Sequence, residues 1–336
     1  MLRLLADDLT GALDSAAPFA AVRGAMLVRW RDDGTASGDA AFDSETRDLG
    51  RSQARMRVAR LTRQMIGAEL AFKKLDSCLR GHPAAEIAAV AIEGGFRTVV
   101  VAPAFPAQGR MTRGGRQLLR EDDGWHDAGV DLARELMAEG LTVRHGRPGP
   151  DGGLYLCDAA DETDLAEIAA SPALAPPVLW CGSAGLARAL AGPTVPVPLA
   201  EALPPPRLLV IGTAHPATLA QLERLGTPPD DVGIARVDLP SGSPPAEARA
   251  ALERLTAGLA DNACPGSTLV IGGETLLCLA DALGAQALSV EGELAPGLAV
   301  ARFTGGRWDG LRVVSRSGGF GAPDLLSNLL HGPNHA

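Results

Sequence analysis

Paired cysteines, long apolar runs and an excess of positive charge are all absent from this chain of 336 residues. The cysteines are odd in number, widely spaced and never in a C-x-x-C pair, which argues against a disulfide framework or a zinc motif. They are Cys78, Cys157, Cys181, Cys264 and Cys278. No apolar run approaches the roughly 18 residues needed to span a bilayer. The formal net charge of -9 disfavours bulk binding to nucleic acid, so any anion site must be built locally.

The N-terminus also lacks a basic segment ahead of a cleavable apolar stretch. Together these absences predict a globular protein of the cytoplasm that binds neither membrane nor nucleic acid. What the chain does contain is apolar residues, 46% of the total, which is enough for two domains with ordinary cores.

Apolar runs alternate with helical patterns along the chain, which is typical of an α/β protein with a mostly parallel sheet flanked by helices. The expected strands are residues 2–5, 70–73, 98–102, 153–157, 178–181, 208–212, 268–271, 298–303 and 311–314. Several of them end in Asp, Gly or Ser just before a helix. Because ligands of open α/β sheets bind outside the carboxyl ends of the strands, these polar ends are the candidate sites.

The composition changes at GPTVPVPLAEALPPPR, residues 192–207, where proline removes backbone donors and favours an extended chain. We therefore expect an N-terminal domain over residues 1–200 and a C-terminal domain over residues 205–336. Each should carry a mostly parallel sheet, and we expect the active site in the cleft between the two domains.

The stretch RLLADDLTGALDSAAPFA, residues 3–20, places Asp7 and Asp8 directly after the first expected strand, with Asp14 further on. One of the paired carboxylates can act as a general base or hold a divalent ion. In a purely structural interpretation, Asp8 or Thr10 caps the helix that follows. A phosphatase of the haloacid-dehalogenase type also has aspartates after its first strand. Its spacing is D-x-D, however, whereas these two are adjacent.

A second cluster lies in FKKLDSCLRGHPAAEI, residues 72–87. Successive strand residues point to opposite faces, so at most one of Lys73 and Lys74 enters a site on a given side. We favour Lys74, because it shares a face with Asp76. Arg80 can hold a carboxylate with two parallel hydrogen bonds, which a lysine cannot do. The alternative is a solvated basic turn.

A third cluster, APAFPAQGRMTRGGRQLL, has Arg110, Arg113 and Arg116 among glycines. Arginine beside flexible backbone suits an anion-binding loop, although an exposed loop without a ligand would have the same pattern.

Three glycine-rich turns follow expected strands in the second half of the chain. They are VIGTAHPATLAQL at residues 210–222, VIGGETLLCL at residues 270–279 and RSGGFGAPDLL at residues 316–326. Glycines let backbone amides approach phosphate oxygens, and a helix N-terminus adds partial positive charge, so the turns suggest a nucleotide. None of them matches a Walker or an ordered G-x-G-x-x-G motif. Each turn alone is compatible with an ordinary helix cap.

Six short segments together resemble the four-carbon acid sugar kinase family, formerly grouped as a domain of unknown function. In chain order they are ADDLTGALDSAAPFA, KKLDSCLRG, VAPAFPAQGRMTRGG, LWCGSAGLARAL, IGGET and SRSGGFG. The resemblance implies a sugar-acid-binding N-terminal domain and a nucleotide-binding C-terminal domain. It also implies ATP-dependent phosphorylation of a terminal hydroxyl on threonate, erythronate or an oxo-tetronate. An acid sugar brings a carboxylate and ATP brings phosphates, which accounts for the local cations.

The resemblance also implies roles for individual residues. Asp8 is the expected catalytic base. The expected substrate-binding residues are Asp8, Arg47, Lys74, Asp76, Ser77 and Arg80. The expected nucleotide-binding residues are Thr213, His215, Gly272, Gly273, Glu274, Thr275, Gly318 and Gly319. Magnesium should accompany ATP, held mainly by phosphates and water, and its protein ligands are not assigned.

The expected partners are an acid sugar and ATP, and a homodimer is compatible with these features. Two segments, between residues 119 and 154 and between residues 218 and 270, are shorter than in the family. Arg316 stands where the family has lysine. These departures keep a sugar-acid- or nucleotide-binding protein without turnover as the alternative, with a phosphatase as a weaker one.

Overall fold

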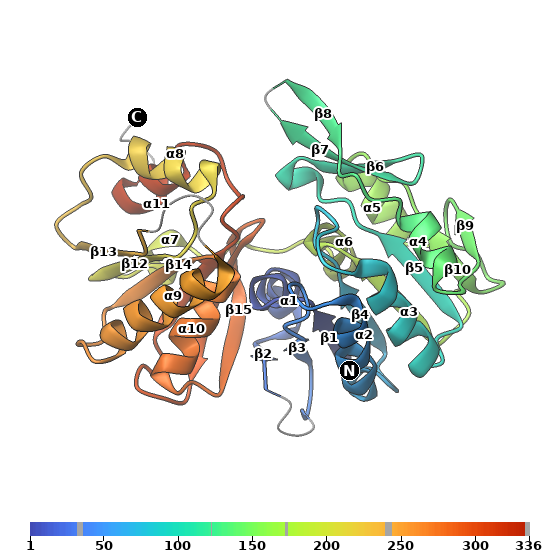
Figure 1. The fold of residues 1–336 in the computed structure, drawn as a ribbon, viewed down its shortest axis with the longest axis horizontal. Coiled ribbons are helices and arrows are strands. Elements are labelled where there is room, and N and C mark those ends of the chain that lie inside the picture. Colours follow the sequence, from blue (N-terminus) through green and yellow to red (C-terminus); the bar gives the residue numbers. More distant parts are fainter. Residues whose placement is uncertain (32–35, 122, 172–173, 239–243, 333–336) are drawn as a thin grey trace. The chain divides into compact units, whose positions relative to one another are not determined.

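The computed structural model describes the chain over residues 1–31, 36–121, 123–171, 174–238 and 244–332. The chain divides into two compact units, Met1–Thr194 (unit 1) and Val195–Ala336 (unit 2), and each has a sheet flanked by helices (Figure 1). The division falls within the proline-rich segment, where consecutive prolines leave few backbone donors for regular structure.

The large sheet of unit 1 consists of parallel strands. In order across the sheet they are β2 (Met26–Arg29), β3 (Ala40–Asp43), β1 (Leu2–Ala6), β4 (Leu70–Lys74), β11 (Val178–Gly182), β5 (Thr98–Ala102), β10 (Gly153–Leu156) and β9 (Val143–His145). The inner strands are buried along nearly their whole length, which is why they read as apolar runs without alternation.

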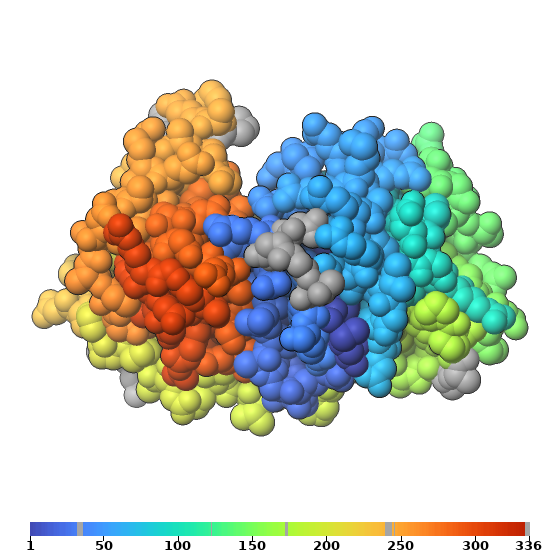
Figure 2. All heavy atoms as spheres, turned by 90° about the horizontal axis from the view of Figure 1, so that it is seen from below, coloured from blue at the N-terminus to red at the C-terminus, as the bar shows by residue number. Residues whose placement is uncertain are grey.

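Two rows of helices cover this sheet. One row contains α1 (Leu9–Arg23), α6 (Ala184–Ala191) and α5 (Glu162–Ala169), and the other contains α2 (Arg51–Leu61), α3 (Pro83–Glu93) and α4 (Leu132–Ala138). Short 3₁₀ turns lie at η1 (Thr62–Gln64) and η2 (Pro106–Gln108). Figure 2 shows the face of unit 1 that carries α2, whose outward side chains include the exposed Met56.

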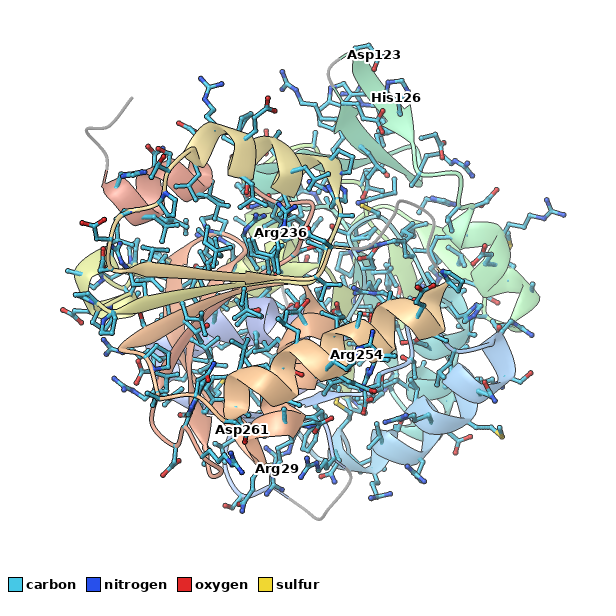
Figure 3. The ribbon with its side chains drawn as sticks, turned by 60° about the vertical axis from the view of Figure 1, so that its left-hand side comes forward. Arg29, Asp123, His126, Arg236, Arg254 and Asp261 are labelled. Atoms are coloured by element: carbon cyan, nitrogen blue, oxygen red, sulfur yellow. The ribbon has the colours of Figure 1, made fainter. Side chains whose placement is uncertain are left out.

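A small antiparallel sheet extends from unit 1 through β6 (Arg110–Arg113), β7 (Arg116–Glu121) and β8 (Gly124–Asp127). Near its tip, Asp123 Oδ1 lies 2.6 Å from His126 Nε2 (Figure 3).

The sheet of unit 2 is mixed. In order across it are β13 (Val232–Arg236), β12 (Arg207–Ile211), β14 (Ser267–Ile271), β17 (Arg312–Arg316), β16 (Leu298–Thr304) and β15 (Ala287–Ala295). The first four are parallel, whereas β16 and β15 join antiparallel. The helices are α7 (Leu199–Ala202), α8 (Pro216–Leu225), α9 (Pro245–Ala260), α10 (Gly273–Leu283) and α11 (Leu325–His331).

All nine strands expected from the sequence are present, and no end is displaced by more than two residues. The expected α/β class is therefore confirmed. The strands that the sequence did not reveal include β2 and β3, which have four residues each, and the antiparallel β15 and the hairpin strands β6 to β8. Runs this short, or with mixed polarity, give little periodic signal.

Candidate active site

The first strand delivers two carboxylates to the carboxyl edge of the unit 1 sheet. Strand β1 ends at Ala6 and α1 begins at Leu9, so Asp7 and Asp8 form the connection. Asp8 is the N-cap of α1, and its Oδ1 accepts a hydrogen bond from the Gly11 amide at 2.8 Å. The capping interpretation is thus confirmed for one oxygen of Asp8, and the cap does not use Oδ2.

Arg47 joins that edge from the neighbouring strand β3. The loop after β3 is tied to the end of β1, because the Thr46 and Arg47 amides donate to Asp7 O at 3.0 and 3.2 Å. The guanidinium donates to both oxygens of Asp7, at 2.9 and 3.0 Å, and to Asp8 Oδ2. Its Nη2 also lies 3.5 Å from Asp76 Oδ1. One arginine therefore connects three carboxylates from the ends of two strands.

The strand on the other side of β1 supplies the remaining residues. After β4, Asp76 accepts two bonds from the Arg80 guanidinium, at 2.9 and 2.7 Å, and one from the Arg80 amide at 3.1 Å. The two-bond geometry expected of Arg80 is present, and its partner is Asp76 of the same turn. Ser77 is buried in this turn, whose backbone is held by Gln117 Nε2 on Ser77 O at 2.7 Å.

The adjacent lysines separate as the strand geometry requires. Lys73 is fully buried on the α3 side, and its Nζ lies 2.7 Å from Glu86 Oε2. Lys74 lies under the first turn of α1, where its Nζ donates to Leu75 O at 2.6 Å and faces Gly11. Lys74 belongs to the carboxylate cluster, whereas Lys73 is part of the core.

Two residues in these loops adopt the left-handed backbone region that favours glycine. Glu45, before Arg47, has φ 48°, and Leu79, before Arg80, has φ 59°. Such conformations typically cost on the order of 1–3 kcal/mol and persist where surrounding contacts impose them. Here the contacts that impose these conformations are the hydrogen bonds that hold Arg47 and Arg80 beside the aspartates.

The cluster ionises unevenly. Burial raises the pKa of Asp7, but the charges of Arg47 and Lys74 outweigh that effect and lower the pKa overall. Burial likewise opposes ionisation of Asp76, but the hydrogen bond from Arg80 and the charge of Arg47 hold its pKa well below the usual range. For Asp8 burial prevails, so its pKa is raised despite Arg47.

Burial raises the pKa of two further carboxyls beside the cluster. Burial raises the pKa of Asp14 to about 8, and burial with the nearby Asp8 charge raises the pKa of Asp43 well above its usual value. The cluster thus places the carboxyl groups of Asp7, Asp8 and Asp76 beside the cationic side chains of Arg47, Lys74 and Arg80.

Unit 2 brings its three glycine-rich turns together at one sheet edge. Strands β12, β14 and β17 are neighbours in register, with Ile211 opposite Ile271 and Ile271 opposite Arg316. Their carboxyl ends lead into residues 213–215, 272–275 and 317–321. A Cβ placed on Gly318 would lie 2.8 Å from Thr213 Oγ1, and one placed on Gly319 would lie 3.1 Å from His215 Nε2. The first and third turns are thus in contact.

The second turn completes this surface. Gly272 precedes α10 with φ 106° and no side-chain cap, which leaves the first-turn amides of α10 available. A Cβ on Gly272 would lie 3.0 Å from the hydroxyl of the buried Thr275. Exposed amides, a helix N-terminus and room made by glycine are the requirements of a phosphate site.

In the third sequence cluster, Arg116 and the two glycine amides bind carboxylates of the chain's own side chains. Arg116 pairs with Asp127 at 2.8 and 3.0 Å. The amides of Gly114 and Gly115 donate to the carboxylate of Asp158 at 2.6 and 2.8 Å. This loop binds an anion as expected of its type, but the anion is a side chain of unit 1.

Within the described residues, three side chains that could share a metal ion lie close together, namely Glu121, Asp123 and His126. All three are exposed and belong to the small hairpin sheet, outside both clusters. No helix in the described ranges is long and apolar enough to cross a membrane.

Both halves of the chain match known domain families. Residues 2–142 match the sugar-binding N-terminal domain, and residues 240–326 match the nucleotide-binding C-terminal domain. A D-threonate kinase of Cupriavidus necator is 32% identical, with 96% of this chain and 95% of the relative covered. The chain belongs to the four-carbon acid sugar kinase family. The kinase expected from the sequence is confirmed, and the phosphatase alternative is not supported.

Two further comparisons agree with this membership. A D-threonate kinase of Salmonella typhimurium is 25% identical, with 98% of this chain and 97% of the relative covered. A solved structure from Salmonella typhimurium LT2, described as a tRNA synthase, has a TM-score of 0.71 at 17% identity and covers 97% of this chain and 98% of its own. At that identity the second comparison shows the fold alone.

Sequence reasoning missed Asp43 and Glu86 as parts of the charged network. Asp43 ends the short strand β3, and an expected strand there would have placed it beside Asp7 and Asp8. Glu86 lies one turn into α3, and a buried partner for Lys73 was the available signal.

Proposed function

We propose that this protein transfers the γ-phosphoryl group of ATP to the terminal hydroxyl of D-threonate. The observation that supports this most strongly is the cluster of paired carboxylates and cations in unit 1, in a chain that is 32% identical to a D-threonate kinase over nearly its full length. Because the cluster carries both carboxylates and cations, it offers a base for a hydroxyl and counter-charges for a substrate carboxylate.

Asp8 is the proposed base. Its Oδ1 is fixed by the Gly11 amide and its Oδ2 faces Arg47, with 21% of the side chain exposed. A raised pKa makes this carboxylate a better proton acceptor near neutral pH than an ordinary aspartate. The substrate oxygen attacks the γ-phosphorus, the bond from that phosphorus to the bridging oxygen of ADP breaks, and the hydroxyl proton passes to Asp8. Arg80, whose side chain is 59% exposed, is the cation of the cluster most open to the substrate carboxylate, while Arg47 and Lys74 lie deeper and are bonded within the cluster.

The three turns of unit 2 are the proposed ATP site. Their amides and hydroxyls suit phosphate oxygens, and Glu274 is the single carboxylate in these turns. A magnesium ion would therefore be held mainly by phosphates and water, with Glu274 as the carboxylate within reach. When bound, it would neutralise charge on the transferred group.

The test is coupled ADP release with Mg-ATP and a panel of sugar acids: D- and L-threonate, D- and L-erythronate and oxo-tetronates. We expect the highest kcat/KM with D-threonate. Preference for D-erythronate would keep the kinase and change the substrate. If no sugar acid in the panel produces ADP release while calorimetry still detects ADP binding, turnover is contradicted and a binding protein is favoured. Phosphate release from esters without ATP would favour a phosphatase.

A further inference from the structure

Among the residues that the structure describes, Arg316 is a fully buried cation without an acidic partner. It is the last residue of β17, in the middle of the unit 2 sheet, and its exposed fraction is 0%. Its hydrogen bonds are all to neutral groups, and in the described ranges its Nε has no hydrogen-bond partner. Burial alone lowers the pKa of Arg316 to about 10, with no charged group opposing it. The guanidinium remains charged at neutral pH.

The contacts of Arg316 converge on all three turns of the proposed ATP site. Nη1 donates to Ser317 O at 3.1 Å and to Phe320 O at 2.7 Å, which holds the third turn. Nη2 donates to Thr218 Oγ1 at 3.3 Å and to Gln221 Oε1, both on the helix that follows the first turn. The Arg316 carbonyl accepts from the Gly272 amide of the second turn at 2.9 Å.

These contacts determine which way the amides of the third turn face. In a trans peptide the carbonyl and the next amide point in opposite directions. Because the Ser317 and Phe320 carbonyls turn toward Arg316, the Gly318 and Gly321 amides turn away from it. Thr218 Oγ1 donates to Gly318 O at 2.7 Å and so turns the Gly319 amide away from α8. No acceptor for these three amides lies in the described part of the chain.

A buried charge without a counter-charge is costly, typically by several kcal/mol. An anion bound against the outward amides would reduce that cost. We propose that Arg316 is a positioning residue for the nucleotide phosphates: it orients the turn 317–321, and its buried charge is compensated by the phosphate that this turn binds. The proposal rests on the proposed function, since it deepens the assignment of the ATP site.

A lysine at this position would supply the charge from a single nitrogen. Arginine spreads its donors over three nitrogens, of which Nη1 here reaches the turn 317–321 and Nη2 reaches Thr218 and Gln221. Charge and geometry can therefore be tested separately with Arg316→Met and Arg316→Lys.

The matched control is Arg312→Met. Arg312 is the first residue of the same strand and lies on the same face of the sheet as Arg316, because the two are four residues apart. It is at the opposite end of the strand, where it pairs with Glu291 at 3.2 Å. Calorimetry would measure the Kd of ADP, inorganic triphosphate and adenosine for each variant. We expect Arg316→Met to weaken ADP and triphosphate about ten- to a hundredfold and to change adenosine less than about twofold. Arg316→Lys should lie between Met and wild type, and Arg312→Met should match wild type.

Equal losses for ADP and adenosine in Arg316→Met would reduce Arg316 to a structural residue, and unchanged affinities would also overturn the proposal. If Arg316→Met does not fold, comparison of Arg316→Lys with Arg316→Gln gives the same test, with the larger loss of ADP affinity expected in Gln. Absence of ADP binding to the wild-type chain would overturn this proposal and the ATP site together. Normal ADP binding without turnover of any sugar acid would contradict the proposed function alone.

Discussion

The two candidate sites are built on the same arrangement of strands, but one consists of charged side chains and the other mainly of backbone amides. In each unit, three neighbouring parallel strands bring their carboxyl ends to one edge, and the functional groups follow those ends. The unit 1 cluster consists of charged side chains that set one another's pKa values. The unit 2 turns consist mainly of backbone amides, small residues and hydroxyls. A substitution in the unit 1 cluster should therefore act through charge, and one within the three turns of unit 2 through shape.

The largest expected effect is that of Asp8→Asn. Asparagine is as good an N-cap as aspartate, so α1 should keep its cap while the base is lost. We expect kcat to fall by roughly 10²- to 10⁴-fold with ADP affinity unchanged. The control is Asp161→Asn, the exposed N-cap of α5, which accepts from the Asp164 amide at 3.0 Å. A wild-type kcat in Asp8→Asn would exclude Asp8 as the base.

The adjacent lysines provide a comparison within unit 1. Lys73→Met leaves Glu86 buried without its partner, so the free energy of unfolding should fall by roughly 3–5 kcal/mol. Lys74→Met should instead lower kcat/KM for the sugar acid. Urea unfolding would measure the loss of stability in Lys73→Met, and kinetics normalised to the amount of folded protein would measure the loss of activity in Lys74→Met. Adding Glu86→Gln to Lys73→Met should restore part of the stability. The assignment fails if Lys73→Met impairs catalysis more than Lys74→Met.

In unit 2 the sharpest change is Gly318→Ala. The new Cβ would lie 2.8 Å from Thr213 Oγ1 and 2.9 Å from Thr213 Cγ2, so the first or third turn must shift. We expect KM for ATP to rise about tenfold and KM for the sugar acid to stay constant. Gly258→Ala in α9 is the control, because no atom lies within 4 Å of a Cβ there. Equal changes in both KM values would mean that the turn does not act on ATP alone.

The last prediction concerns the dependence of stability on pH. In the folded chain burial raises the pKa of Asp14 to about 8, whereas an unfolded aspartate titrates near about 4. Between these values the unfolded chain releases a proton that the folded chain retains, so Asp14 contributes stability at low pH that is lost as the pH rises toward 8.

Asp14→Asn cannot ionise and should remove this loss. Urea unfolding at pH 5 and pH 8 should show the variant gaining on the wild type at pH 8. Asp161→Asn, at an exposed cap, should keep the wild-type dependence. Parallel pH curves for wild type and Asp14→Asn would show that Asp14 is not held protonated by the fold.

Local patterns predicted much of this molecule. The nine apolar runs became strands, and opposite strand faces separated Lys73 from Lys74. The short motifs also identified which strand ends carry polar residues. The sequence predicted less well which groups bind one another. Arg80 has a two-bond carboxylate partner, but that carboxylate is Asp76, and the glycine loop near Arg116 binds Asp158.

The sequence by itself determined the fold class and the residues that end the strands, because apolar runs and the turn residues that follow them are local patterns along the chain. Only the tertiary structure decided that Arg47 bridges Asp7, Asp8 and Asp76, that Asp14 is held protonated, and that Arg316 is buried without a counter-charge. Ion pairing and desolvation depend on which groups are adjacent in space and how much water is excluded. In a parallel sheet, strand order sets both.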